Sequence, residues 1–251
     1  MLIDSHCHVD RFPNPTELAD ECESQHILTV AVTNLPSHYE VAVEHLSSLR
    51  FVKPALGFHP LAVADNRSEL DVFLSLVTSV SLIGEVGLDF SAEGIKSRSE
   101  QLRVFRQIAE SLSDNSRFVT LHSRGSAEDV VSVLEEYGVA PCVFHWYSGS
   151  SSTLKRLVGL NHYCSVNSAM LTSKKGRSVL ETVPRERILT ETDGPYIKVG
   201  KRAVRPNDVR EIVEGIAEAW NVSADDAEAQ VSDNFMNLCQ QLNIPVEDYA
   251  S

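Results

Sequence analysis

Short apolar runs alternate with amphipathic stretches along most of this chain. The apolar runs are nearly continuous, a pattern typical of parallel strands that are covered on both faces. Eight such runs predict strands: Met1–His6, Ile27–Thr33, Phe51–Phe58, Val80–Gly84, Phe118–His122, Cys142–Trp146, His162–Val166 and Arg187–Glu191. Helical periodicity predicts helices over Tyr39–Leu49, Glu69–Val77, Glu100–Leu112, Ala127–Tyr137, Ser152–Leu157, Gly176–Thr182, Asn207–Trp220 and Ala224–Leu242.

This alternation predicts an α/β fold, a single TIM-type (β/α)8 barrel. Eight β-α units in 251 residues match the size of such a barrel, and we expect one domain over residues 1–251. A doubly wound open sheet is the alternative. The first β-α turn, Cys7–Pro15, lacks the glycine-rich phosphate loop of such sheets, which favours the barrel.

The composition, 43% hydrophobic and 23% charged, is that of a globular protein. The chain contains no run of about 18 apolar residues, so we expect no membrane span. Its first residues show neither a basic segment before an apolar run nor a small-residue cleavage site, so we expect no secretory signal. The five cysteines form no C-x-x-C pair and are odd in number, which indicates reduced thiols in a cytoplasmic protein.

The formal net charge is −13. Proteins that hold a long duplex through many phosphate contacts are usually basic, so the charge argues against a broad duplex-binding groove. It does not exclude a small phosphodiester or the end of a strand, because bound metal ions supply a local positive field.

The candidate chemistry begins with His6-Cys7-His8 at the end of the first run. Residues two apart on a strand point the same way, so both imidazoles can reach one metal ion while Cys7 points away from it. Further polar residues follow later runs, at the end of the barrel where such enzymes place their active sites. They are His59, Glu85, His122, His145 and Asp193.

Each of these residues has a structural interpretation when it is taken alone. His122 could be a hydrogen-bonded residue at a strand end, and Asp193 could initiate a turn. Glu85 could form an ion pair with Arg124 or Arg205. Their joint occurrence at one end of the barrel instead indicates a metal centre, because buried charges and imidazoles need counter-charges that divalent cations supply.

Six ligands suit two ions better than one. We expect His6, His8 and Asp193 to hold the first ion and His122 and His145 the second, with Glu85 as the bridge. Imidazole and carboxylate ligands favour zinc, manganese or similar ions over calcium, and the identity among zinc, magnesium and manganese stays open. Two ions roughly 3.5–4 Å apart would activate a water and stabilise the developing oxyanion. Asp193 could hold that water or take its proton, so Glu85 and Asp193 are also candidate catalytic residues.

Four further residues near the strand ends are candidate substrate contacts. We expect His59 to contact phosphate or donate to the leaving group. Arg124 could fork onto a phosphate or form an ion pair. Trp146 and Tyr147 could stack on a base or pack at the rim. The remaining histidines are expected to be surface or structural residues: His26, His38, His45 and His162.

Together these segments resemble the TatD family of metal-dependent hydrolases, within the amidohydrolase-like barrels. The matching motifs are Ile3-Asp4-Ser5-His6-Cys7-His8, Gly57-Phe58-His59-Pro60, Gly84-Glu85-Val86-Gly87-Leu88-Asp89, His122-Ser123-Arg124, His145 with Ser148-Gly149, and Glu191-Thr192-Asp193-Gly194-Pro195-Tyr196. The resemblance implies a TIM barrel, a divalent-metal centre and phosphodiester hydrolysis. It also implies 3′-to-5′ exonuclease action on single-stranded DNA, and sometimes RNA.

The chain departs from the family pattern in segments that would face the substrate. Gly125-Ser126 follows Arg124, where many members carry Asp or Glu and then Ala, and Trp146-Tyr147 replaces a more common Cys-Phe. Arg205-Pro206-Asn207 resembles a shortened version of a longer loop. The ligands are all kept, so hydrolysis is better supported than any one substrate. In this divergence the chain resembles members that belong to multi-gene antiviral defence systems, whose other proteins would be its partners.

Three functional hypotheses follow. The first is a two-metal phosphodiesterase acting on nucleic-acid ends or small phosphodiesters. The second keeps the centre but hydrolyses a C–N or C–O bond, or removes an amino acid from misacylated tRNA. Amidohydrolases of that kind often bridge their metals with a modified lysine on strand 4, whereas this chain has Glu85 there and no lysine between Lys53 and Lys96. The third is a scaffold with an inactive barrel, against which the complete ligand set argues.

Overall fold

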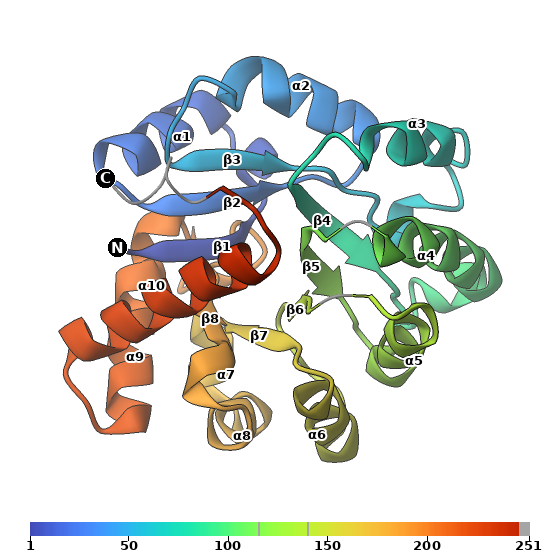
Figure 1. Ribbon diagram of the computed structural model, residues 1–251. Helices are drawn as coiled ribbons and strands as arrows, with labels where there is room; N and C mark the ends of the chain where they lie inside the picture. Colours follow the sequence, from blue (N-terminus) through green and yellow to red (C-terminus); the bar gives the residue numbers. More distant parts are fainter. Residues whose placement is uncertain (115, 140, 246–251) are drawn as a thin grey trace.

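Every predicted strand is present in the computed structural model, in which residues 1–114, 116–139 and 141–245 are described. The strands are β1 (Ile3–Cys7), β2 (Leu28–Val32), β3 (Val52–Ala55), β4 (Leu82–Gly87), β5 (Phe118–His122), β6 (Val143–Phe144), β7 (Tyr163–Val166) and β8 (Ile188–Thr190). They pair in parallel in the orders β1-β2-β3 and β4-β5-β6-β7-β8 and surround one interior (Figure 1). The predicted TIM-type barrel is therefore confirmed.

Main-chain hydrogen bonds join β3 to β4. Leu56 pairs with Ile83 as an isolated parallel bridge. The Leu56 N–H donates to the Leu82 carbonyl at 3.0 Å, and the Gly84 N–H donates back to the Leu56 carbonyl at 2.9 Å. This short seam connects the two groups of strands on one side of the barrel.

Side chains close the barrel between β8 and β1. The Ser5 hydroxyl donates to the Thr190 carbonyl at 2.8 Å. The buried carboxylate of Asp4 accepts the Thr192 N–H at 2.8 Å and also the Thr192 hydroxyl. Burial raises the pKa of Asp4 to about 8, although the hydrogen bonds from Thr192 act in the opposite direction. The first strand is thereby tied to the segment that carries Asp193.

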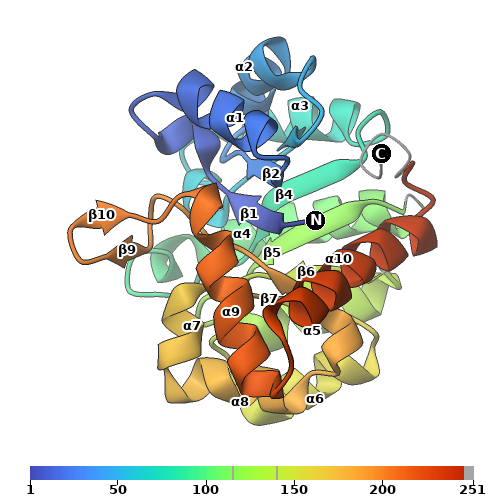
Figure 2. The ribbon, with the colours of Figure 1, turned by 90° about the vertical axis from the view of Figure 1, so that its left-hand side faces the viewer.

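Helices surround the strands on the outside of the barrel (Figures 1 and 2). The α-helices are α1 (Pro15–Ser24), α2 (Pro36–Leu46), α3 (Glu69–Leu76), α4 (Arg98–Ser113), α5 (Ala127–Tyr137), α6 (Ser151–Gly159), α7 (Ser168–Thr172), α8 (Lys174–Thr182), α9 (Val209–Trp220) and α10 (Ala224–Gln241). Short 3-10 turns are η1 (Val9–Arg11), η2 (Pro60–Ala62), η3 (Ile95–Ser97), η4 (Arg185–Arg187) and η5 (Pro206–Asp208). Across the described ranges, no helix combines the length and the apolar character needed to cross a membrane.

Some elements were absent from the prediction. Helix α1 begins with Pro15 at its first position, where a missing N–H costs no hydrogen bond. Only Leu18, Ala19 and Cys22 of this helix are buried, a stripe too short to stand out in the sequence. The short helix α7 was also not predicted, nor was the hairpin of β9 (Lys198–Val199) and β10 (Arg202–Ala203). Two-residue strands are too short to show an alternating pattern.

Helix α10 closes the amino-terminal end of the barrel, across which it runs in Figure 2. The Asn234 side chain donates to the Ile188 carbonyl at 2.8 Å, and the Phe235 ring packs against Phe118 with 5.5 Å between centroids. The amino group of Met1 forms an ion pair with Glu228 at 3.0 Å. The end of the barrel left open is the one where the strands finish.

His162 is a structural histidine, as predicted. Its Nδ1 accepts the Cys142 N–H at 3.1 Å, and its ring packs edge-on against Phe144. Burial lowers the pKa of His162 to about 4, and the nearby Arg187 guanidinium acts in the same direction.

We expect this histidine to make the fold sensitive to acid. The unfolded chain binds a proton on this ring near its ordinary pKa, whereas the folded chain binds it only near pH 4, so the contribution to stability is lost as the pH falls through this window. Between about pH 7 and pH 5 the loss amounts to about 2 kcal/mol. His162→Asn, which keeps an acceptor for Cys142, should remove that part of the pH dependence. Urea unfolding at the two pH values measures the free energy of unfolding of each variant, with the exposed His45→Asn as the control. An equal pH dependence in parent and His162→Asn would contradict this prediction.

Candidate metal centre

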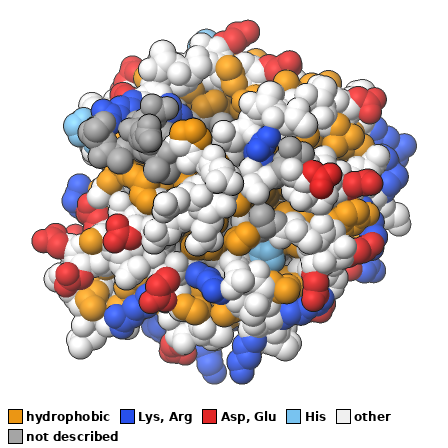
Figure 3. Space-filling model, in the orientation of Figure 1, with side chains coloured by type: hydrophobic (Ala, Val, Ile, Leu, Met, Phe, Trp, Pro, Cys, Tyr) orange, Lys and Arg blue, Asp and Glu red, His pale blue; other side chains and the backbone are white. Residues whose placement is uncertain are grey.

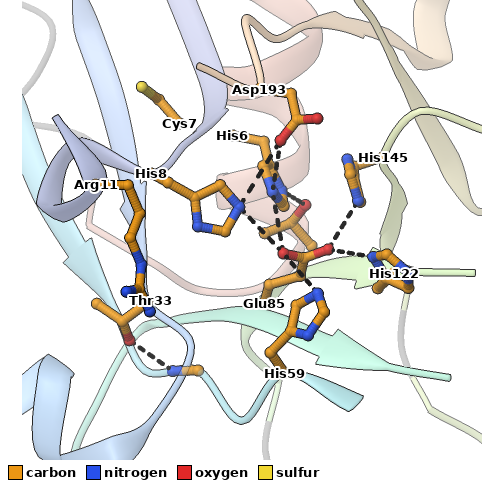
Figure 4. Close-up of polar contacts among 12 residues, drawn as sticks. His6, Cys7, His8, Arg11, Thr33, His59, Glu85, His122, His145 and Asp193 are labelled. Atoms are coloured by element: carbon orange, nitrogen blue, oxygen red, sulfur yellow. Dashed lines mark hydrogen bonds and ion pairs between the residues drawn. The ribbon is translucent and has the colours of Figure 1, made fainter. Parts of the chain in front are cut away.

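The carboxylate of Glu85 lies at the centre of the open end, surrounded by imidazoles (Figure 4). Its Oε1 is 2.6 Å from His122 Nδ1 and 2.8 Å from His145 Nε2. The distances from Oε2 to the Nε2 atoms of His6, His8 and His59 are 3.6, 3.2 and 3.6 Å. Glu85 is only 1% exposed, so its charge depends on these neighbours rather than on water. Burial alone would raise the pKa of Glu85, but the surrounding histidines hold it well below its usual range.

Asp193 faces His6 and His8 from the end of β8. Its Oδ1 lies 3.8 Å from His6 Nε2 and 3.7 Å from His8 Nε2, distances too long for hydrogen bonds. His6 Nδ1 is engaged by the Thr120 hydroxyl at 2.8 Å, whereas the buried His6 Nε2 has no hydrogen-bond partner. Burial raises the pKa of Asp193 to about 7. A ring nitrogen without a partner opposite a carboxylate is the arrangement that a cation would complete.

The donor atoms fit divalent metal ions. Three groups of side chains each bring one nitrogen or oxygen to within 4.8 Å of the others in the group. These groups are His6, His8 and Asp193; His6, Glu85 and His145; and His59, Glu85 and His122. Imidazole and carboxylate donors suit zinc, manganese and similar ions. The structure thus brings all six sequence-predicted ligands together, and Glu85 belongs to two of the three groups.

Two glycines allow the strand ends to converge on Glu85. A Cβ atom on Gly57 would lie 1.6 Å from the carbonyl oxygen of Thr33, and one on Gly84 would lie 2.3 Å from the Thr120 side chain. The Gly57 N–H instead donates to the Thr33 hydroxyl at 3.1 Å. Without side chains at these positions, β2, β3, β4 and β5 approach closely enough for Glu85 to meet imidazoles from other strands.

Asp89 orients His122, a role that sequence reasoning missed. Its Oδ2 accepts a hydrogen bond from His122 Nε2 at 2.8 Å, and its Oδ1 accepts the Ser91 N–H at 2.8 Å. Burial opposes the charge on Asp89, yet the hydrogen bonds from His122 and Ser91 lower its pKa to about 2. The second nitrogen of His122 is left facing Glu85. A carboxylate behind a histidine ligand is a recurrent support in metal sites, and the Gly87-Leu88-Asp89 motif was its signal in the sequence.

Glu191 is a second missed residue, and it supports the ends of β6, β7 and β8. Its fully buried carboxylate accepts the Trp146 N–H at 3.0 Å and the Asn167 amide at 2.7 Å, and also the Ser165 hydroxyl. His145 Nδ1 lies 3.7 Å away. Trp146 has a left-handed backbone with φ of 37°, which its hydrogen bond to Glu191 holds in place.

Cys7 points away from the centre, as predicted (Figure 4). Its Sγ hydrogen bonds the Gly194 carbonyl at 3.6 Å, and its side chain is buried among apolar residues outside the barrel. All five cysteines are free thiols with buried side chains.

A cleft of about 760 Å³ opens above Glu85. Among its lining residues are the predicted substrate contacts His59, Arg124 and Trp146, whose indole is 38% exposed. Within the described residues Arg124 forms no ion pair with Glu85, and Arg205 instead pairs with Glu21 at 2.7 Å. The structural interpretation of Glu85 as the partner of either arginine is therefore wrong.

Tyr147 does not reach this cleft, which corrects its prediction as a substrate contact. Its side chain is only 3% exposed, and its hydroxyl donates to the Ser150 carbonyl at 2.7 Å. Neighbouring side chains point in different directions here, so Trp146 faces the cleft and Tyr147 faces the interior. The second aromatic residue at the mouth is Tyr196, which is 54% exposed and stands edge-on to the His8 ring. Its position directly after the Asp193 motif was the available signal.

A parallel barrel whose strand ends gather imidazoles around a shared carboxylate belongs to the class of metal-dependent barrel hydrolases. A family model described as TatD related DNase matches residues 3–240. The chain belongs to this family, as its resemblance predicted. It is therefore a metal-dependent hydrolase of the TatD DNase type.

Individual relatives match almost the whole chain. An uncharacterized metal-dependent hydrolase, YabD of Bacillus subtilis, is 28% identical over 255 residues, which cover 95% of this chain and 98% of the relative. The human deoxyribonuclease TATDN3 is 27% identical, over 96% of this chain and 95% of its own. The solved structure of YjjV, a TatD homolog from Escherichia coli, has a TM-score of 0.78 at 22% identity, over 97% of this chain and 98% of its own. A TatD family hydrolase from Entamoeba histolytica has a TM-score of 0.79 at 17% identity, over 94% and 97%. These two structures share the fold.

Metal removal should destabilise the protein through Glu85. Because an ion that binds only the folded chain at about 100 times its dissociation constant adds about 2.7 kcal/mol, we expect Zn²⁺ or Mn²⁺ to raise the melting temperature of chelator-treated protein by about 5–10 °C. Glu85→Gln should lose most of this rise, whereas the exposed Glu44→Gln should keep it. Thermal unfolding with and without ions measures both. A full rise in Glu85→Gln would contradict the central place given to this carboxylate.

Loss of the Asp89 carboxylate should weaken metal binding without unfolding the barrel. Asp89→Asn leaves the orientation of His122 less defined, and such changes typically reduce metal affinity about 10–100-fold. Competition with a chromophoric chelator measures the affinity, and the exposed Asp71→Asn is the matched control. Unchanged metal affinity in Asp89→Asn would mean that the hydrogen bond to the Asp89 carboxylate is not needed to orient His122.

Proposed function

We propose that this protein, acting as one domain, is a two-metal phosphodiesterase that removes nucleotides from the 3′ end of single-stranded DNA or RNA. The observation that carries the proposal is the buried carboxylate of Glu85, which belongs to two candidate ligand groups beneath an open cleft. A carboxylate shared in this way can hold two ions close enough together to act on one phosphate, and the cleft leaves room for the substrate above it.

The predicted ligands would form two sets around the shared carboxylate. His6, His8 and Asp193, which form one of the three groups, would hold one ion. His122 and His145, which both contact Glu85 Oε1, would hold the other, with Glu85 common to both. Zinc, manganese and magnesium are the candidate ions. Bound there, such ions would supply Lewis acidity toward a phosphate oxygen and a nucleophilic water at neutral pH.

Asp193 and His59 would move or hold protons during the reaction. Asp193 lines the cleft next to His8, where its carboxylate can take a proton from the attacking water. His59 Nδ1 accepts the Leu61 N–H at 3.2 Å, so in the neutral ring the hydrogen is on Nε2, which faces the centre. Burial lowers the pKa of His59 to about 3 and keeps this ring neutral. These contacts support His59 as a hydrogen-bond donor to phosphate or to the leaving oxygen rather than as a ligand.

Arg124 and Trp146 would hold the substrate from the side of the cleft formed by β5 and β6. The Arg124 guanidinium can donate two parallel hydrogen bonds to a phosphate. The exposed indole of Trp146 offers a surface on which a base can stack irrespective of its sequence. Such contacts suit a strand end better than a paired duplex.

Hydrolysis of an amide, or of the aminoacyl ester of misacylated tRNA, is the alternative at the same centre. Glu85 rather than a lysine on β4 supports the phosphodiesterase. Partnership with other proteins of an antiviral defence system stays a prediction, which co-purification from the native source would test.

Digestion of end-labelled single-stranded DNA tests the proposal. We expect protein supplied with Mg²⁺, Mn²⁺ or Zn²⁺ to shorten 5′-labelled DNA into a ladder and to release mononucleotide from 3′-labelled DNA. Shortening from the 5′ end would overturn the proposed polarity. Absence of cleavage by protein that binds its ions would overturn the nuclease proposal and direct attention to small phosphodiesters and amides.

Replacing Asp193 should abolish most of this activity. Asp193→Asn removes both a ligand charge and the proton acceptor, so we expect kcat to fall by about 10²–10⁴-fold. Glu85→Ala should fall at least as far while the barrel stays folded, as circular dichroism would show. The exposed Asp20→Asn serves as the control. Parent-like cleavage by Glu85→Ala would remove this residue from the proposed site.

A further inference from the structure

A basic hairpin stands beside the mouth of the cleft. Strands β9 and β10 form it, and Figure 2 shows it extending from the body of the barrel. The segment from Lys198 to Arg205 carries four cations and no acidic residue, in a chain with a net charge of −13. Those cations are Lys198, Lys201, Arg202 and Arg205.

The hairpin is anchored at its base and joined directly to the cleft. Ile197 and Val204 are buried on either side, and the Val204 N–H donates to the Ile197 carbonyl at 2.9 Å. Gly200 supplies the left-handed turn, with φ of 64°. Tyr196, which lines the cleft, precedes the hairpin, so the Cα of Lys198 lies within about 7 Å of the Cα of Tyr196. A ligand that leaves the cleft past Tyr196 meets the hairpin next.

Two of the four cations have partners within the protein. Arg202 donates to both carboxylate oxygens of Asp208, at 2.7 and 3.0 Å, and Arg205 pairs with Glu21. Lys198 and Lys201 are exposed, and neither forms an ion pair or side-chain hydrogen bond within residues 1–114, 116–139 and 141–245. The hairpin thus presents two ammonium groups that are available to an external anion.

Many other surface cations are neutralised by neighbours. Ion pairs of this kind are Arg98–Asp129, Arg103–Glu100, Arg106–Glu136 and Arg156–Glu128. Figure 3 shows the face over which helix α10 runs, and basic and acidic side chains are interspersed there as well. Two exposed ammonium groups on a narrow hairpin suit a flexible single polyanion, whereas a duplex needs many phosphate contacts over a wide surface.

We propose that the β9–β10 hairpin binds the phosphate backbone of the single strand whose end occupies the cleft. Lys198 and Lys201 neutralise phosphates a few nucleotides from the scissile bond, and Tyr196 lies between them and the metal centre. The hairpin therefore favours strands over dinucleotides without contacting the reacting atoms. This inference rests on the proposed nuclease function.

The test compares Lys198→Gln/Lys201→Gln with the parent on two lengths of oligothymidylate. Binding of a fluorescein-labelled strand of about 16 nucleotides is followed by anisotropy across about 50–200 mM salt, with Ca²⁺ in place of the catalytic ion. Loss of two phosphate contacts should reduce the slope of log affinity against log salt by about 1.4. Between about 50 and 200 mM salt, the affinity of the variant for the strand should therefore fall by a factor about sevenfold smaller than that of the parent. Cleavage of the thymidine dinucleotide should stay at the parent rate.

The charge-matched control is Lys155→Gln/Arg177→Gln, on helices α6 and α8, which should behave like the parent in every measurement. An unchanged salt slope in the hairpin variant, with a parent that cleaves the long strand, would overturn the hairpin proposal and leave the nuclease function intact. A parent that neither binds nor cleaves either oligonucleotide would overturn both. Equal losses on the dinucleotide and the long strand would place the lysines at the reacting end and also overturn the proposal.

Discussion

The buried carboxylate of Glu85 is the constraint on which the rest of the open end depends. A buried carboxylate needs positive charge close to it. Five imidazoles from the ends of four strands surround Glu85, but a neutral imidazole carries no charge, so protons or metal ions must supply it. Without metal ions this charge comes from protons: beside the carboxylates, the pKa of His122 and that of His145 are raised despite burial, while burial lowers the pKa of His6 to about 4. Binding of divalent ions would release those protons, so metal affinity and pH are linked at this centre.

The surrounding residues hold that centre in shape. Asp89 and Glu191 lie behind the histidine ligands and are themselves hydrogen bonded to main-chain and side-chain donors. Asp4 ties β1 to the segment after β8, and so places His6 and Asp193 opposite each other. The left-handed backbones of Trp146 and Asp193 lie at the ends of β6 and β8, where the surrounding hydrogen bonds can maintain them.

An acidic protein that acts on a polyanion must concentrate its positive charge. Here that charge would reside in the ions at the centre, in Arg124 on one side of the cleft and in the β9–β10 hairpin on the other. The rest of the surface can stay acidic without preventing a single strand from entering. In the proposed function, this distribution would separate the chemistry at the metal centre from strand recognition by Arg124 and the hairpin.

The sequence by itself determined the barrel, because continuous apolar runs are a local pattern of parallel strands that are covered on both faces. It also predicted which strand-end histidines and carboxylates converge, because active sites of such barrels lie at the carboxyl ends of the strands. Tertiary structure alone decided which polar residues support the ligands: Asp89 and Glu191 act through contacts with residues 33 and 45 positions away, which no local pattern reveals. The tertiary structure also places Tyr196, rather than the predicted Tyr147, at the mouth of the cleft. The direction of a side chain beyond a strand end depends on the backbone turn there. The hairpin has only two residues in each strand, and its position depends on the burial of Ile197 and Val204 at its base, which no local pattern predicted.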